Sequence, residues 1–266
     1  MSAEDYGDQY DVETFLRRVL SVVDPALRRR QVERHLTTVD APTVAAHIHE
    51  VLERSTTGDE RANAMLLPLI AVVDRPDGAN AFAVEAVNLE ARAQGLATLS
   101  WWLLDPPPFR AIDPRQVKHA SSASQSLGHR RAAAATSTDP RELERLALDD
   151  HPMVVDRVCA NPRTQESHIM AVVTRRPTRP DVLDAVALHA RWLQRLPVRE
   201  SLVMNPFART GLALRLLPTL GGPRWASIRH AGQVHPAVSA FAAHLCRVRD
   251  GEEVLEGPES LAETRH

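Results

Sequence analysis

Apolar residues recur at spacings of three and four along most of the chain, which is the period of an amphipathic α-helix. Helix-start residues such as Asp24-Pro25 and Asp59 precede several of these stretches, and the proline run after Asp105 ends the last stretch of the first half because proline supplies no N–H donor. Before that proline run the pattern predicts helices over residues 12–23, 25–36, 42–52, 59–73, 82–93 and 96–104.

Beyond residue 128 the sequence repeats itself. Residues 138–147 align without gaps to residues 178–187, and both segments begin with Thr-x-Pro. Residues 154–162 align in the same way to residues 198–206, and both end in Asn-Pro. A capping oxygen followed by proline starts a helix, whereas a residue that precedes proline is pushed out of the helical region. The repeats therefore predict stacked pairs of short helices, each burying one apolar stripe against its neighbours.

The pattern Thr-x-Pro-x-x-Leu-x-x-Leu-Ala, followed by Pro-x-Val-x-x-x-Val-x-x-Asn-Pro, resembles the leucine-rich-repeat-variant and HEAT-like class of bacterial helical repeats. The resemblance covers roughly residues 128–249, and it implies an α-solenoid with an extended binding surface. Some leucine-rich-repeat-variant proteins carry an N-terminal iron–sulfur module bound by cysteines. Because no cysteine precedes Cys159 in this chain, that module is not expected here.

We therefore expect an all-α protein in which an N-terminal helical region precedes a degenerate α-solenoid. The solenoid is degenerate because the repeats are separated by unequal distances of 40 and 44 residues. The expected parts are a flexible acidic N-terminus (1–11), an N-terminal helical region (12–105), a Pro/Ser-rich linker (106–128), a helical-repeat region (129–249) and a flexible acidic tail (250–266).

Composition excludes several classes of protein. The 266 residues contain no run near the roughly 18 apolar residues that span a membrane. Two cysteines, Cys159 and Cys246, are too few for a disulfide framework or a four-thiolate metal site. The acidic N-terminus has no apolar core of a secretory signal. These features predict a cytoplasmic protein with two buried thiols, without membrane insertion and without a metal or cofactor.

Charge is unevenly distributed, although the formal net charge is only −2. Residues 129–250 contain 18 basic and 11 acidic side chains, whereas residues 251–266 contain 1 and 5. This asymmetry permits an anionic partner for the middle segment, or contact with the protein's own acidic segments. The isoelectric point of about 6.6 is nevertheless below the basic value of dedicated nucleic-acid binders.

Arginines of the repeat region are the most distinctive candidate site, because equivalent positions of stacked repeats line one face. The set is Arg130, Arg131, Arg157, Arg163, Arg175, Arg176, Arg179, Arg191, Arg195 and Arg199. The members other than Arg157 form the candidate face for an anionic partner. Acidic residues are interleaved with these arginines, which favours solvated faces and local ion pairs over a continuous phosphate-binding stripe.

The adjacent Trp101 and Trp102 point about 100° apart on a helix, so one is expected in the core and the other is a candidate surface anchor for a protein partner.

Polar residues of the repeats are expected to have structural roles. Asn161 and Asn205 are expected to satisfy backbone groups where a helix stops. Asp149-Asp150 is expected to be an acidic pair on the surface at a helix end.

These observations favour a non-catalytic protein–protein interaction scaffold or adaptor, because stacked repeats offer an extended surface and no catalytic motif is visible. The first alternative is nucleic-acid binding through the arginine face. Arginines scattered over all faces of the repeats would argue against this alternative. The second is an enzyme similar to HEAT-like DNA glycosylases, which would need a pocket with an aromatic pair beside a carboxylate.

Overall fold

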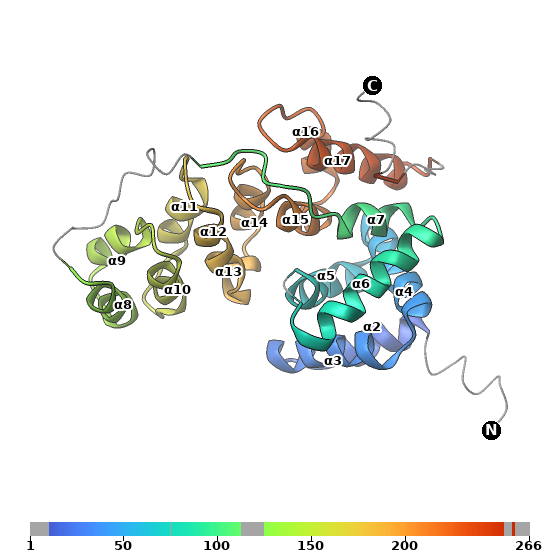
Figure 1. Cartoon of the computed structure of the whole chain (residues 1–266), viewed down its shortest axis with the longest axis horizontal. Helices are drawn as coiled ribbons and strands as arrows, with labels where there is room; N and C mark the ends of the chain where they lie inside the picture. The colour runs from blue at the N-terminus through green and yellow to red at the C-terminus, as the bar shows by residue number, and fades with distance from the viewer. Residues whose placement is uncertain (1–10, 75, 113–124, 253–256, 259–266) are drawn as a thin grey trace. The chain divides into compact units, whose positions relative to one another are not determined.

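The computed structural model describes residues 11–74, 76–112, 125–252 and 257–258 (Figure 1). All regular structure within these ranges is helical, which confirms the all-α class. The chain divides into two compact units. Unit 1 comprises the described residues of 1–105, 214–231 and 236–266, and unit 2 comprises those of 106–213 and 232–235. Residues 1–10 of the expected N-terminal segment, most of the Ser-rich part of the linker and most of the acidic tail lie outside the described residues.

Unit 1 is built from helices of both ends of the chain. Helix α4 contacts α5, α6 and α7, while α17 contacts α4, α7 and α16. Apolar side chains from these helices form its core, including Leu52, Leu66 and Phe241. The helices are α2 (Val12–Leu20), α3 (Pro25–Thr38), α4 (Ala41–Thr56), α5 (Glu60–Val73), α6 (Gly78–Ala93), α7 (Ala97–Leu103), the 3-10 helix η1 (Leu217–Leu220), α16 (Gly222–Ile228) and α17 (Pro236–Arg249).

Aspartates start the first helices, as the sequence predicts. Asp24 Oδ1 accepts hydrogen bonds from the backbone N–H of Ala26 at 2.7 Å and of Leu27 at 3.0 Å. Asp59 Oδ1 does the same for Arg61 at 2.8 Å and Ala62 at 3.1 Å. Each carboxylate thereby satisfies two of the N–H groups that a helix leaves unpaired at its start.

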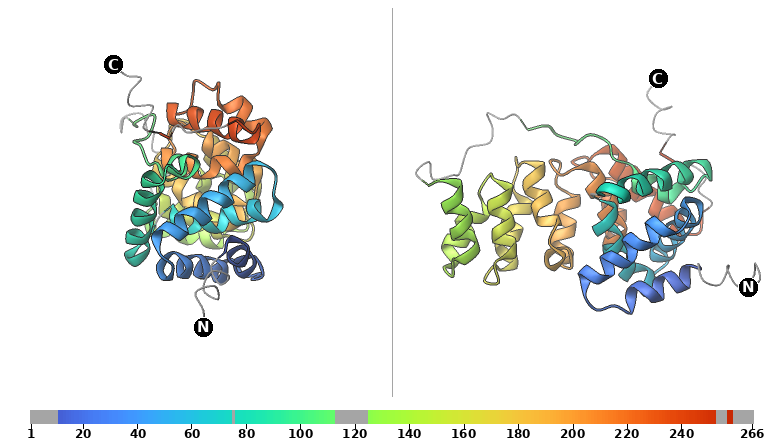
Figure 2. Two further views of the ribbon diagram at one scale, coloured as in Figure 1. Left: turned by 90° about the vertical axis from the view of Figure 1, so that its right-hand side faces the viewer. Right: turned by 60° about the horizontal axis from the view of Figure 1, so that its bottom comes forward.

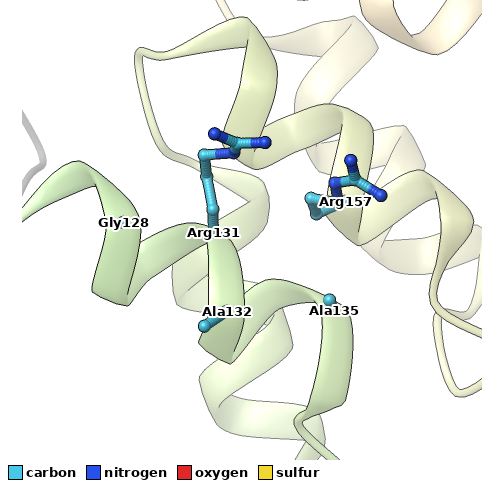
Figure 3. A pocket seen from close by; sticks show the side chains of 5 residues that line it. All are labelled: Gly128, Arg131, Ala132, Ala135 and Arg157. Atoms are coloured by element: carbon cyan, nitrogen blue, oxygen red, sulfur yellow. The ribbon is translucent and has the colours of Figure 1, made fainter.

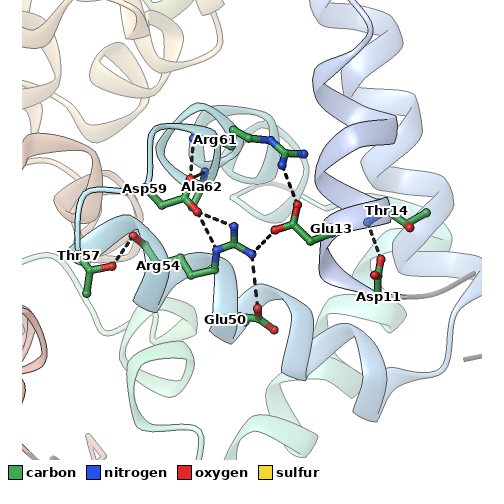
Figure 4. A network of polar contacts seen from close by, with 9 residues as sticks. All are labelled: Asp11, Glu13, Thr14, Glu50, Arg54, Thr57, Asp59, Arg61 and Ala62. Atoms are coloured by element: carbon green, nitrogen blue, oxygen red, sulfur yellow. Dashed lines mark hydrogen bonds and ion pairs between the residues drawn. The ribbon is translucent and has the colours of Figure 1, made fainter. Parts of the chain in front are cut away.

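A network of charged side chains fastens α2 to the rest of unit 1 (Figure 4). Arg54 of α4 lies at its centre, with Nη2 at 2.6 Å from Asp59 Oδ2 and Nη1 paired with Glu13 of α2 and with Glu50. Arg61 Nη1 lies 2.7 Å from the other oxygen of Glu13. The hydrogen bond from Arg54 lowers the pKa of Glu13, so this carboxylate is ionised at neutral pH.

The C-terminal segment belongs to unit 1, although the sequence grouped all of residues 129–249 with the repeats. Polar contacts inside the core explain the difference. Trp102 Nε1 donates to the carbonyl oxygen of Arg215 at 3.0 Å. The hydroxyl of Thr98 hydrogen-bonds His244 Nε2 at 2.8 Å. These contacts join α7 to segments more than a hundred residues away, so they leave no local pattern in the sequence.

Unit 2 consists of short helices that lie side by side in two rows (Figure 2). In one row α10 contacts both α8 and α12, and in the other α11 contacts both α9 and α14. The helices are α8 (Leu127–Thr136), α9 (Pro140–Ala147), α10 (Pro152–Ala160), α11 (Glu166–Thr174), α12 (Pro180–Ala187), α13 (Ala190–Leu193), α14 (Leu196–Val203) and α15 (Thr210–Leu216), which continues into unit 1 from Leu214.

Each of the two asparagines of the Asn-Pro motif joins its own helix to the preceding helix of the same row. Asn161 Nδ2 donates to the carbonyl oxygens of Ala134 at 2.9 Å and of Ser137, the C-cap of α8, at 3.0 Å. Asn205 Nδ2 donates to those of Val173 at 2.8 Å and of Arg175, the C-cap of α11, at 3.2 Å. Both side chains are buried. The predicted capping role is confirmed, and the carbonyls belong to the preceding helix of the same row.

Replacement of either asparagine by alanine is expected to lower the free energy of unfolding by about 2 kcal/mol, because two buried or partly buried carbonyls lose their donor. Urea denaturation of Asn161→Ala and Asn205→Ala measures this effect. The control is Gln194→Ala, which removes an exposed amide and is expected to change stability by less than about 0.5 kcal/mol. Equal losses in all three variants would show that the asparagine contacts do not stabilise unit 2.

Candidate functional site

Five of the predicted arginines donate to backbone carbonyls within unit 2, among them Arg130, whose Nη1 bonds the carbonyl oxygen of Gln125 at 3.0 Å. Arg175 Nη1 bonds the carbonyl oxygen of Leu148 at 2.6 Å, and Arg191 Nη2 bonds that of Thr164 at 2.9 Å. Arg176 Nη2 bonds the carbonyl oxygen of Met204 at 2.8 Å. Arg199 Nη1 bonds the carbonyl oxygen of Leu193 at 2.5 Å. The carbonyls of Leu148, Leu193 and Met204 lie at the C-terminal ends of helices, where no intrahelical donor remains. These guanidinium groups therefore join separate segments of unit 2.

Arg191 has a second role beside its hydrogen bond. Its guanidinium carbon lies 4.3 Å from the ring centre of the buried Trp192, a cation–π distance. Trp192 Nε1 in turn donates to the carbonyl oxygen of Cys159 at 3.0 Å, which fastens α13 to α10. Burial raises the pKa of the Cys159 thiol to about 12, so this cysteine is a protonated, buried side chain, as predicted.

Ion pairs engage further members of the arginine set. Arg130 Nε lies 2.7 Å from Asp149 Oδ2, with only 13% and 5% of the two side chains exposed. Arg175 Nη2 lies 2.6 Å from Asp150 Oδ1. The expected surface position of Asp149-Asp150 is therefore wrong: both carboxylates are buried because each pairs with an arginine of a neighbouring helix or loop.

Two more arginines of the set pair with acids at the surface. Arg179 binds Asp181 through two hydrogen bonds of 3.0 and 2.6 Å. Arg195 Nε lies 3.8 Å from Glu166 Oε2. Arg163 is exposed. Most of the predicted arginine face thus consists of structural contacts, which leaves few guanidinium groups for an external anion.

A hollow between α8 and α10 brings together Arg131 and Arg157 (Figure 3). Its volume is about 280 Å³, and Gly128, Ala132 and Ala135 complete its lining. Arg157 did not belong to the predicted anionic-partner face. The signal that could have placed it beside Arg131 is an alignment of α8 with α10, but α8 lacks the Asn-Pro ending that identifies the repeats.

The two candidate anchor residues, Trp101 and Trp102, are both buried in unit 1, with 4% and 0% of their surface exposed. The ring of Trp101 stacks near that of Phe241 with 6.1 Å between ring centres. The expectation that one tryptophan lies on the surface is therefore corrected. The C-terminal helix α17 supplies the ring that covers Trp101. No local sequence pattern near residue 101 predicts this contact.

Helix α6 carries a second apolar stripe that the sequence analysis did not separate from its buried one. Val87 and Ala91 face the core, whereas Phe82 and Leu89 are 82% and 58% exposed. The positions that share this outer face follow one another at spacings of four, four, three and four residues. We call this set the α6 outer stripe: Gly78, Phe82, Ala86, Leu89 and Ala93.

Buried histidines form the main titratable cluster of unit 1. The ring of Phe15 stacks on His35 with 3.8 Å between centres, and His35 Nε2 lies 3.2 Å from His47 Nδ1. Burial lowers the pKa of His35 to about 3 and that of His244 to about 4. The pKa of His49 is lowered for the same reason. With pKa values this low, His35 and His244 are neutral at physiological pH and serve as core side chains.

Among the described residues, no group of three or more His, Cys, Asp or Glu side chains is arranged to bind a metal ion. Within the same ranges, no helix has both the length and the apolar character that crossing a bilayer requires.

The histidine cluster predicts a loss of stability in acid. The unfolded chain binds protons at these histidines below pH 6.5, whereas the folded chain resists protonation down to about pH 3–4, so the free energy of unfolding falls as the pH falls through this window. Each histidine contributes at most about 1.4 kcal/mol per pH unit. Urea unfolding between pH 7.5 and 4.5 measures the slope, and His35→Phe is expected to flatten it. An unchanged slope in that variant would contradict the assignment.

Comparison of the chain with protein-family models, with curated proteins and with solved structures finds no match.

Proposed function

We propose that the protein is a non-catalytic protein–protein interaction scaffold or adaptor. The observation that carries this proposal is the α6 outer stripe. A helix that is apolar on two faces is normally covered on both. Phe82 and Leu89 instead remain exposed on a helix whose opposite face is already buried. Burying such side chains contributes roughly 1.5–3 kcal/mol each, so a partner that covers the stripe gains affinity from it.

Unit 2 supports the proposal through its architecture. We infer that its two rows of contacting helices form a degenerate α-solenoid of the leucine-rich-repeat-variant and HEAT-like kind. The support is that Asn161 and Asn205, 44 residues apart, make the same contact with the end of a preceding helix. Stacked units of this kind expose an elongated surface, on which protein partners bind in helical-repeat proteins generally. This part of the proposal is an analogy at the level of fold.

The two alternatives have less support. A phosphate-binding face needs several available cations in a row, whereas Arg175, Arg191 and Arg199 donate to backbone carbonyls. A glycosylase-like site needs an aromatic pair beside a carboxylate. The hollow between α8 and α10 has neither in its lining.

The test is a pull-down from native lysate with the full chain, with and without nuclease, at two salt concentrations. We expect a stoichiometric protein that survives nuclease and both salt concentrations. The variant Phe82→Glu/Leu89→Glu is expected to capture at least about tenfold less of it, because two charges replace the apolar contact. The control Ala81→Glu/Arg92→Gln changes the net charge by the same amount at exposed α6 positions beside the stripe and is expected to retain the partner.

Two outcomes would overturn the proposal. One is equal capture by wild type and by Phe82→Glu/Leu89→Glu, which would show that the stripe makes no contact. The other is recovery of nucleic acid alone, with retention that falls steeply as salt increases, which would move the function to a phosphate-binding surface.

A further inference from the structure

We propose that the hollow between α8 and α10 binds carboxylate side chains of an acidic peptide segment, with Arg131 and Arg157 as the two donors. This site lies in unit 2 and is chemically distinct from the α6 outer stripe. The inference does not depend on the stripe, because it rests on guanidinium groups rather than on apolar surface.

The state of the two arginines is the first support. Most other arginines of unit 2 donate to carbonyls or pair with acids, as Arg130 does with Asp149. Arg131 differs from Arg130, because its guanidinium has no hydrogen bond or ion pair with any described residue, and its Nε is also shielded from solvent. Shielded donors are nearly always paired in folded proteins. An acceptor supplied by a ligand would give the Nε–H of Arg131 a hydrogen-bond partner.

Arg157 is similarly available to a ligand. Its nearest acid is Asp156, whose Oδ2 lies 3.9 Å from Arg157 Nε, and both side chains are substantially exposed. Asp156 also has its own partner, since its Oδ1 lies 2.9 Å from His189 Nε2. An exposed ion pair of this length contributes little, so it does not prevent Arg157 from binding another carboxylate.

The floor of the hollow is the second support. Gly128, Ala132 and Ala135 follow one another at spacings of four and three residues, so they share one face of α8. None has a side chain larger than a methyl group, which lets a peptide backbone approach the helix closely. Figure 3 shows Arg131 and Arg157 rising from neighbouring helices at the border of this floor.

Size and charge identify the ligand as an acidic peptide. A volume of about 280 Å³ lies below the range of about 300–1,000 Å³ typical of small-molecule pockets, and it suits one or two side chains. Two guanidinium groups match carboxylates in charge and in hydrogen-bond geometry. A nucleic-acid strand needs a longer row of cations than the two guanidinium groups of this hollow provide.

The test is fluorescence anisotropy with a dye-labelled hexaglutamate peptide and the full chain at low ionic strength. We expect saturable binding that weakens at least about tenfold in Arg131→Gln/Arg157→Gln, because both charge-assisted contacts are lost. Ala132→Leu fills the floor without changing charge or helix propensity appreciably, and it is expected to weaken binding to a similar extent. The matched control is Arg163→Gln, which removes an exposed arginine of the same unit and is expected to change the affinity less than about twofold.

Three results would overturn the inference: no saturable binding of hexaglutamate, an equal loss in Arg163→Gln, or tighter binding of a single-stranded oligonucleotide that requires the same two arginines. Melting curves establish that each variant is folded. The variant Phe82→Glu/Leu89→Glu separates this inference from the proposed scaffold function, because it is expected to lose the protein partner while retaining hexaglutamate binding.

Discussion

The unpaired carbonyls at helix ends are the constraint on which unit 2 depends. An α-helix leaves its last four carbonyls without an internal partner, and helices of eight or nine residues such as α9 and α10 therefore leave nearly half of theirs unpaired. Asn161 and Asn205 reach across to the carbonyls of a preceding helix, and Arg175 and Arg191 add further donors. Side chains of neighbouring segments thus supply donors to several of the carbonyls that these short helices leave unpaired.

This constraint also separates structural arginines from those available for binding. A count of basic residues in the sequence makes the middle of the chain look like an anion-binding face. Once Arg175, Arg191 and Arg199 are assigned to carbonyls and Arg130 to Asp149, fewer guanidinium groups remain available, among them the pair in the hollow and the exposed Arg163.

Much of the fold follows from local sequence signals. Asp59, Pro140 and the Asn-Pro motifs predict where helices begin and end, because capping oxygens, proline geometry and the residue before proline act over a few residues. The structural role of Asn205 follows from the same reasoning.

Other features depend on contacts between distant segments and could not be predicted in this way. The contact between Trp102 and Arg215 spans 113 residues, and that between Thr98 and His244 spans 146. They place the C-terminal helices in unit 1 and bury both tryptophans. The α6 outer stripe could be predicted only in part. Its apolar residues are visible in the sequence, but only the structure shows that the opposite face of the helix is buried in the core of unit 1.

The central claim is that the α6 outer stripe contacts a protein partner. Site-specific photo-cross-linking in living cells tests it most directly, with a benzophenone amino acid in place of Phe82 and, as control, in place of Ala81 on the same helix. The account predicts one dominant cross-linked protein from position 82 and little from position 81. Equal, diffuse cross-linking from both positions would contradict it.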